Sequence, residues 1–159
     1  MVYLVENGTQ KAALKVARAD SSRKFWLQKE TDHLRAANEA GVGPKLLGWN
    51  AESQAILMEY IEGKTFNKWL EEEISPAQWK KFETALLKQA RALDAAGIDH
   101  GQLSKRGKNI LVRKGLPVIV DFEKASLVRK PHNEGAIQNL LHRNPKSWIA
   151  KRVKELNLE

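Results

Sequence analysis

Polar side chains able to do chemistry stand in four separate segments of the chain. Lys15 lies in the run Ala-Leu-Lys-Val, Glu30 in the charged stretch that follows, Asn109 just before Ile-Leu-Val, and Asp121 after Val-Ile-Val. An ammonium is a hydrated point charge on a flexible stem, and a carboxylate at the end of an apolar strand is a suitable Mg²⁺ ligand. Taken alone, each of these residues is equally compatible with a solvated face or a turn. Its role therefore depends on the helices and strands that position it.

The first sixty residues predict an antiparallel sheet and one helix. Asn7-Gly8 between two β-rich runs is the strongest short signal for a hairpin. A helix capped by Ser21 or Ser22 is expected to run to about Ala40, before the breaker sequence Gly-Val-Gly-Pro. Its apolar face contains Leu27, Leu34 and Ala37. The predicted strands are residues 2–6, 10–17, 45–49 and 54–60.

The remaining chain predicts helices around one small strand pair. Ser75 is a plausible N-cap, Pro76 suits the first turn, and Gln78 completes a capping box, so a long helix is expected between Ser75 and Gly97. Strands are predicted at 109–112 and 117–120, and helices near 134–142 and 146–156. The fold class is therefore α+β with two lobes, an N-terminal lobe of residues 1–61 and a C-terminal lobe of residues 62–159.

The order of these segments resembles the protein-kinase-like superfamily. The run Ala-Leu-Lys-Val is similar to the kinase strand motif V-A-I-K, and His-Gly-Gln-Leu followed by Asn109 is similar to the catalytic loop H-R-D-L-x-x-x-N. Val-Asp-Phe-Glu at 120–123 resembles D-F-G, and Met58-Glu59-Tyr60 falls where kinases place the adenine-binding hinge. The resemblance is closest to the small archaeal predicted serine/threonine protein kinases, and looser to RIO kinases and the tRNA-modification-complex kinase. Those families have abbreviated C-terminal lobes.

This resemblance implies an ATP-dependent phosphotransferase acting on Ser or Thr hydroxyls, with Mg²⁺ as the metal. Lys15 is then expected to hold phosphates and Glu30 to orient Lys15, although Asp32 is an alternative for that role. Asn109 and Asp121 are the expected metal ligands, and Gln102 is expected to lie near the acceptor. The expected adenine contacts are Met58 as gatekeeper and the backbone of Glu59, Tyr60 and Ile61.

Four departures from the kinase pattern affect the expected activity. Gln102 occupies the position of the catalytic aspartate, and a neutral amide is a very poor proton acceptor. Gln102 and Asn109 are seven positions apart, against five in the motif, and whether nearby Asp99 substitutes is open. The run Met-Val-Tyr-Leu looks like the strand after a glycine-rich lid, so the lid is expected to be missing. Glu123 replaces the glycine of D-F-G.

The charge balance indicates a preference for polyanions. The net charge is +8 and the isoelectric point is about 9.7. Residues 104–114 carry five basic side chains and no acidic one, so RNA or an acidic partner is expected there, with a solvated loop as the alternative. A non-catalytic kinase-like module that binds nucleotide, a partner or the ribosome is the second interpretation of the whole chain.

Cysteine is absent, which excludes disulfides, thiolate catalysis and Cys-based zinc sites. The sequence contains no signal-peptide pattern and no membrane-length apolar run, so a cytoplasmic protein is expected. The four histidines are expected to be structural, and the five tryptophans are expected mainly to anchor the packing of the core and lobes.

Overall fold

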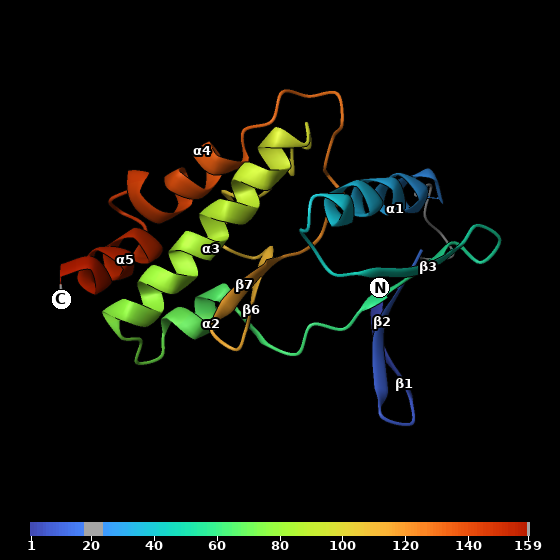
Figure 1. Ribbon diagram of the computed structural model, residues 1–159, viewed down its shortest axis with the longest axis horizontal. Helices are drawn as coiled ribbons and strands as arrows, with labels where there is room; N and C mark the ends of the chain where they lie inside the picture. The colour runs from blue at the N-terminus through green and yellow to red at the C-terminus, as the bar shows by residue number, and fades with distance from the viewer. Residues whose placement is uncertain (18–23, 159) are drawn as a thin grey trace.

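The computed structural model describes residues 1–17 and 24–158 and has two lobes (Figure 1). The N-terminal lobe is a four-stranded antiparallel sheet in the order β1-β2-β4-β3, with one helix beside it. Its elements are β1 (Val2–Asn7), β2 (Gln10–Val16), α1 (Lys24–Glu39), β3 (Leu46–Asn50) and β4 (Ala55–Glu59). The α+β, kinase-like fold class predicted from the sequence is confirmed.

The predicted β1–β2 hairpin is confirmed, because Asn7 pairs with Gln10 and Val2 pairs with Lys15 across the two strands. The two turn residues are Gly8 and Thr9, one position later than the Asn7-Gly8 signal, and Gly8 has a φ of 62°. The predicted apolar face of α1 is buried, with Ala37 fully inaccessible to solvent. The caps proposed at Ser21 and Ser22 lie outside the described residues.

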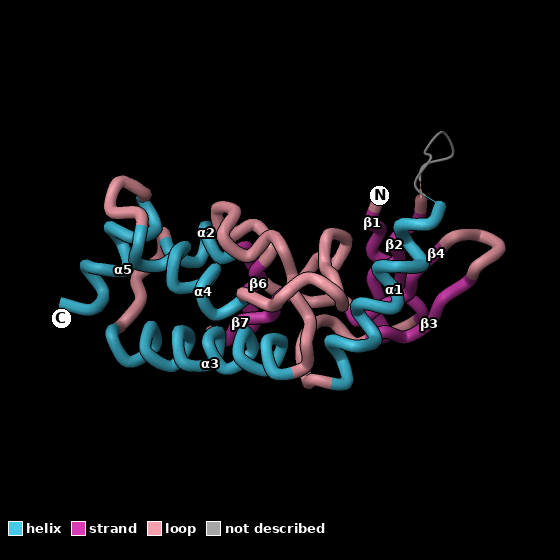
Figure 2. Tube along the Cα trace, turned by 90° about the horizontal axis from the view of Figure 1, so that it is seen from above, coloured by secondary structure: helices cyan, strands magenta, loops and turns pink. Residues whose placement is uncertain are grey.

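The C-terminal lobe is mainly helical and contains a three-stranded sheet in the order β5-β6-β7. Its strands are β5 (Lys64–Thr65), β6 (Ile110–Arg113) and β7 (Leu116–Ile119), and its helices are α2 (Phe66–Leu70), α3 (Pro76–Ala95), α4 (Asn133–Gln138), the π-helix η1 (Asn139–Arg143) and α5 (Trp148–Leu158). Figure 2 shows α3 running along the lobe beneath α4 and the β6–β7 pair. The capping box predicted for α3 is present, with Ser75 Oγ accepting from the N–H of Gln78 at 3.1 Å.

Two parts of this lobe differ from the sequence prediction. The elements β5 and α2 were not predicted, because two and five residues are too few to show a period. The single helix predicted over 134–142 is instead α4 followed by a π-helical turn.

An aromatic cluster forms the centre of the helical core. Phe66 from α2 stacks on Phe82 from α3, with ring centroids 5.4 Å apart, and Trp69 lies 4.5 Å from Phe82. Trp79 is 1% exposed. The role predicted for the tryptophans is therefore right for Trp69 and Trp79. It is wrong for two others, Trp26 and Trp148, which are 43% and 47% exposed.

No helix in the described part of the chain is long and apolar enough to cross a membrane.

Candidate functional site

A cavity of ≈ 300 Å³ lies between the two lobes, and residues from both lobes line it. That volume is at the lower end for small-molecule sites. Its N-terminal wall includes Lys15, Glu30 and the segment 58–61, and its C-terminal wall includes Asp121. The structure thus gathers into one cavity every residue expected to contact nucleotide. The other lining residues are Val2, Ala13, Leu34, Pro44, Leu111, Val120 and Phe122.

Lys15 connects two carboxylates at one end of the cavity. Its Nζ lies 2.8 Å from Glu30 Oε1 and 3.7 Å from Asp121 Oδ1. The side chains of Lys15 and Glu30 are 18% and 6% exposed, whereas that of Asp121 is 39% exposed. Asp32, the alternative to Glu30, instead forms an exposed ion pair with Arg35 on the outer face of α1. Geometry therefore assigns the pairing with Lys15 to Glu30.

Burial and charge act in opposite directions on this ion pair. Burial raises the pKa of Glu30, and although Lys15 opposes this, the pKa stays above its usual value. Burial also acts to lower the pKa of Lys15, but the charges of Glu30 and Asp121 more than offset it, so the pKa is raised. Lys15 is consequently a permanent cation near neutral pH. A second carboxylate oxygen, Oδ1 of Asp121, lies 3.7 Å from its Nζ.

Asp121 and Asn109 lie at the same end of the β6–β7 ladder. Val120 donates its N–H to the carbonyl of Asn109 at 2.9 Å, one residue before Asp121. Asp121 has a φ of 65°, a conformation that a non-glycine residue keeps only where its surroundings impose it. The Asn109 amide nitrogen donates to the carbonyl of Gln102 at 3.3 Å. Since a carbonyl only accepts, this bond identifies the amide nitrogen and leaves the Asn109 amide oxygen for another donor or a cation.

Gln102 lies outside the cavity lining, and its backbone is well anchored. Its N–H donates to His100 Nδ1 at 3.3 Å, while His100 Nε2 lies 2.9 Å from the carbonyl of Val120. These two bonds require a neutral ring protonated at Nε2, and burial lowers the pKa of His100, which favours that form. His100 thus couples the loop that bears Gln102 to the strand that delivers Asp121.

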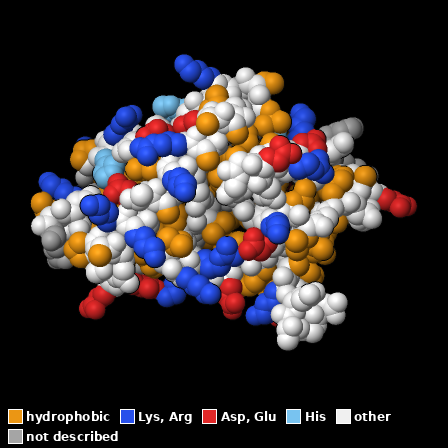
Figure 3. Space-filling model, viewed as in Figure 1, with side chains coloured by type: hydrophobic (Ala, Val, Ile, Leu, Met, Phe, Trp, Pro, Cys, Tyr) orange, Lys and Arg blue, Asp and Glu red, His pale blue; other side chains and the backbone are white. Residues whose placement is uncertain are grey.

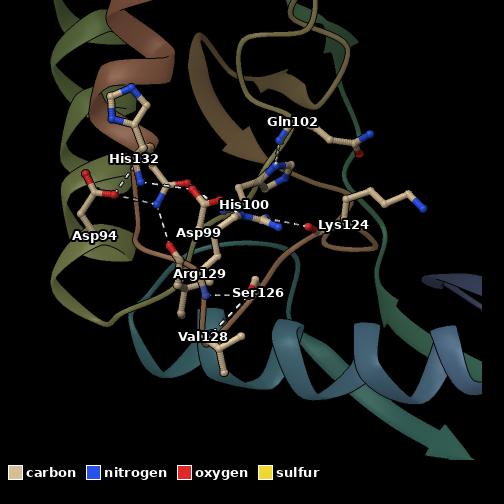
Figure 4. Close-up of polar contacts among 11 residues, drawn as sticks. Asp94, Asp99, His100, Gln102, Lys124, Ser126, Val128, Arg129 and His132 are labelled. Carbon is tan, nitrogen blue, oxygen red and sulfur yellow. Dashed lines mark hydrogen bonds and ion pairs between the residues drawn. The ribbon is translucent and has the colours of Figure 1, made fainter.

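Asp99 is held in a structural cluster in which each of its carboxylate oxygens accepts a hydrogen bond. Arg129 Nε donates to Oδ2, and the N–H of His132 donates to Oδ1 at 3.1 Å (Figure 4). Asp99 is 8% exposed. Figure 4 shows the Gln102 side chain directed away from this cluster. The neighbouring Gly101 has a φ of 84°, and a Cβ there would lie 2.6 Å from Arg129, so only glycine fits. These contacts favour a structural role for Asp99 over the role of a replacement base.

The hinge segment after β4 is held by its own ion pair. Glu59 accepts from Arg113 of β6 at 2.6 Å and from the N–H of Lys45 at 3.1 Å. Ile61 is 7% exposed. Among the described residues, no hydrogen bond engages its N–H. Ile61 is also one of the residues that line the cavity, and a buried backbone donor in such a wall suits the polar edge of a ligand.

One stripe of α1 contacts the segment after Asp121. Trp26, Glu30 and His33 follow one another at spacings of four and three residues, so they share one helix face. The Nζ of Lys124 lies 4.2 Å from the centre of the Trp26 ring, and His33 Nδ1 lies 3.3 Å from the carbonyl of Phe122. Between them, Glu30 reaches Asp121 through Lys15. The helix is therefore attached to the 121–124 segment at three successive levels.

Comparison with known families identifies this arrangement. A family model described as the RIO domain matches residues 2–144, which is most of the chain. The chain belongs to the RIO domain family. This RIO domain is thus a kinase-like protein, and such families generally use ATP and a divalent metal.

One curated relative supports the same placement. The chain is 30% identical over 139 residues to the KEOPS complex subunit Bud32 of Pyrococcus abyssi, a match that covers 84% of this chain. The match spans only 62% of the length of that relative. The resemblance to RIO kinases and to the tRNA-modification-complex kinase, which rested on short motifs, is confirmed by both comparisons.

Sequence reasoning missed the apolar walls of the cavity in this RIO domain. Ala13 lies two residues before Lys15 on the same face of β2, and Leu111 lies on the strand after Asn109, so alternation within strands could have found both. Arg113 and its partner Glu59 are 54 residues apart. No local pattern predicts a pair of that kind.

Proposed function

We propose that this RIO domain binds Mg-ATP between its lobes and transfers the γ-phosphoryl group slowly to a Ser or Thr hydroxyl. The observation that carries the proposal is the chain of contacts from Glu30 through Lys15 to Asp121, beside an apolar cavity. A cation that is held in place by a buried carboxylate and directed at a second carboxylate is suited to phosphate oxygens.

The residues present fit the ligand and its metal. The apolar part of the cavity suits a planar base, with Met58 beside it and the N–H of Ile61 as a donor. Glu30 Oε2 is buried without a hydrogen-bond partner among the described residues, so the pair with Lys15 leaves acceptor capacity inside the site. Asp121 and the Asn109 amide oxygen would hold Mg²⁺, which neutralises charge on the phosphates.

The transfer itself consists of one bond formed and one broken. The hydroxyl oxygen attacks the γ-phosphorus, the bond to the bridging oxygen breaks, and ADP leaves with the electron pair. The hydroxyl proton passes to water, because the neutral amide of Gln102 cannot accept it. A general base is typically worth about 10²–10⁴ in rate, so the expected turnover is slow.

Titration calorimetry with Mg-ATP tests the binding step. The double variant Lys15→Met, Glu30→Gln removes the cation without leaving a lone buried charge, and Asp121→Asn removes the metal carboxylate; both are expected to weaken binding. Asp32→Asn, on the outer face of the same helix, is the matched control. Unchanged affinity in both folded site variants would discard the nucleotide site.

A second candidate function is a kinase-like module that binds nucleotide without turnover. It is favoured by Gln102 together with the engagement of Asp99 by Arg129 and His132. Radiolabelled ATP with a generic protein substrate separates the two functions. Label transfer that Asp121→Asn abolishes supports the enzyme, whereas Mg-ATP binding without any transfer supports the module.

Two wider features belong to the same proposal. The lobes would meet at residues 61 and 62, within the segment between β4 and β5.

The relative from Pyrococcus abyssi is a KEOPS complex subunit by name, and a comparable protein assembly is proposed for this chain. Co-purification of the tagged chain from its source would identify the partner subunits.

A further inference from the structure

A second cavity, of ≈ 380 Å³, lies in the C-terminal lobe and shares no lining residue with the first. Its walls come from α2, the loop at 104–108, η1 and the start of α5. Among its lining side chains are the amides of Asn67, Asn139 and Asn144, the guanidinium of Arg106 and the indole of Trp148. The cavity therefore combines apolar walls from Leu140, Ile149 and Trp148 with amide groups and one guanidinium.

The wall formed by residues 104–108 is the lengthened loop between Gln102 and Asn109. Asn67 of α2 donates its amide to the carbonyl of Arg106 at 2.9 Å. Gly107 has a φ of 66°, and a Cβ there would lie 2.6 Å from the Phe66 ring, so glycine lets the loop lie directly on α2. The lengthened loop thus forms a fixed wall of residues 104–108 that places Arg106 at the cavity.

The segments that form the walls of this cavity carry basic side chains and no acidic residue of their own. The three wall segments, residues 66–70, 104–114 and 135–154, contain no Asp or Glu. Some exposed cations elsewhere are paired, as Lys64 is with Glu72 and Arg91 with Glu134. Around the cavity, six exposed cations have no ion-pair partner among the described residues: Lys105, Arg106, Lys108, Arg143, Lys146 and Lys151. Figure 3 shows Lys and Arg side chains spread over the helical lobe.

Trp148 distinguishes this surface from a general polyanion patch. It is the first residue of α5, and it is 47% exposed although it is a large hydrophobic side chain. Lys151 follows three residues later on the same helix face. An exposed indole near several cations offers a stacking platform to a nucleobase, while the basic side chains bind the phosphates of the adjacent backbone. The three asparagines supply both donors and acceptors for base edges.

We propose that this cavity binds single-stranded RNA, with a base stacked on Trp148 and adjacent phosphates held by Arg106 and its neighbouring cations. Single-stranded RNA exposes bases that can stack on aromatic side chains, whereas bases in a duplex are already stacked. A phosphopeptide would use the cations but has no need of the indole platform or of three amides. The proposal is independent of nucleotide binding between the lobes.

Fluorescence anisotropy of a labelled twelve-nucleotide single-stranded RNA of mixed sequence, titrated with the whole chain at several salt concentrations, tests this site. Trp148→Ala is expected to raise the Kd about 5- to 150-fold, which is the range of base-on-aromatic stacking, and Trp148→Tyr is expected to retain most of the affinity. Trp26→Ala, which removes another exposed tryptophan, is the matched control. It should leave the Kd within about twofold if stacking carries the effect.

The salt dependence tests the phosphate contacts separately. Each phosphate neutralised on a single strand contributes roughly 0.7 to the slope of log K against log salt. Arg106→Gln should lower that slope by about 0.7, whereas Lys80→Gln, an exposed cation on α3, should lower it less. Arg106→Gln and Trp148→Tyr provide the same comparison if Trp148→Ala fails to fold, as judged by its thermal melt.

Three outcomes would overturn the proposal. The first is no RNA binding at about 50 mM salt, where the counterion contribution is strong. The second is an equal effect of the Trp148 and Trp26 variants. The third is a phosphopeptide or heparin that binds more tightly than the RNA and is indifferent to Trp148→Ala, which would make the surface a general anion site.

Discussion

Removal of Lys15 should make the stability of the protein depend on pH in a defined way. Lys15→Met leaves Glu30, whose side chain is 6% exposed, without the cation that faces it at 2.8 Å. Removing one partner of a buried ion pair costs about 3–5 kcal/mol, because the other charge stays buried. Since Lys15 is 18% exposed and the site is open to water on the side of Asp121, we expect the lower end, ~3 kcal/mol of unfolding free energy near pH 8.

The sign follows from the direction of the Glu30 pKa. Burial already raises this pKa above 4.5, and loss of Lys15 removes the contribution that lowers it, so it rises further in the variant. Above pH 4.5 the folded variant then keeps a proton that the unfolded chain has released. Its stability therefore falls as the pH rises through this window, by at most ~1.4 kcal/mol per pH unit. Near pH 4.5 the destabilisation of the variant comes only from the change in packing, and we expect it to be below ~1.5 kcal/mol of unfolding free energy.

Urea unfolding of wild type and Lys15→Met at intervals from pH 4.5 to pH 9 measures this curve. The double variant Lys15→Met, Glu30→Gln is the control, because a neutral pair of similar volume has no buried charge to titrate. It should unfold within ~1 kcal/mol of the wild type and lose the pH dependence. A destabilisation that is constant over the whole pH range, or a double variant as unstable as Lys15→Met, would refute the reasoning.

Four other substitutions have expected outcomes. Gln102→Asp should raise the rate of label transfer from ATP toward the 10²–10⁴ expected of a general base, and an unchanged rate in the folded variant would contradict placing Gln102 beside the acceptor. Asp99→Asn should lower the unfolding free energy by ~1–3 kcal/mol through the lost bond from Arg129 while Mg-ATP affinity in calorimetry stays the same; a selective loss of affinity would argue against its structural role. Ser75→Ala should cost ~1 kcal/mol in urea unfolding through the lost cap of α3, and no measurable change would mean that the cap is dispensable. Phe82→Ala should cost ~3–5 kcal/mol by opening a cavity in the aromatic cluster, and a cost below ~1 kcal/mol would show that the cluster collapses to fill it.

The elements that the sequence predicted correctly carry strong local signals. The signal Asn7-Gly8 predicted the β1–β2 hairpin, although the turn residues are Gly8 and Thr9, with glycine supplying the positive φ at the first turn position. The long helix α3 has a complete cap at Ser75 and twenty residues of regular apolar spacing. By contrast, β5 consists of two residues that pair with β6 some fifty positions away, and only the tertiary fold brings such a pair together. The π-turn in η1 likewise has no period of its own in the sequence.

The candidate site was predictable to the extent that its residues belong to motifs. Lys15, Glu30 and Asp121 were expected to be neighbours, and their side chains are within ion-pair distance. The state of Asp99 could not be predicted, because its partner Arg129 lies thirty residues away in an irregular segment. The exposure of Trp148 was predicted wrongly for a related reason. Trp148 is the first residue of α5, and its exposure depends on how that helix packs in the tertiary fold.

The stripe of Trp26, Glu30 and His33 on α1 has a consequence for motion. The three contacts lie on one line of a rigid helix, so a rotation or axial shift of α1 that breaks one of them misaligns all three. A slide of one helical turn, ~5.4 Å, would be needed to bring a new row of side chains opposite the same segment. The helix and residues 121–124 therefore behave as a single mechanical unit. We therefore expect the cavity to widen by bending of the segment between β4 and β5, and amide hydrogens on α1 and on residues 121–124 to exchange with solvent together.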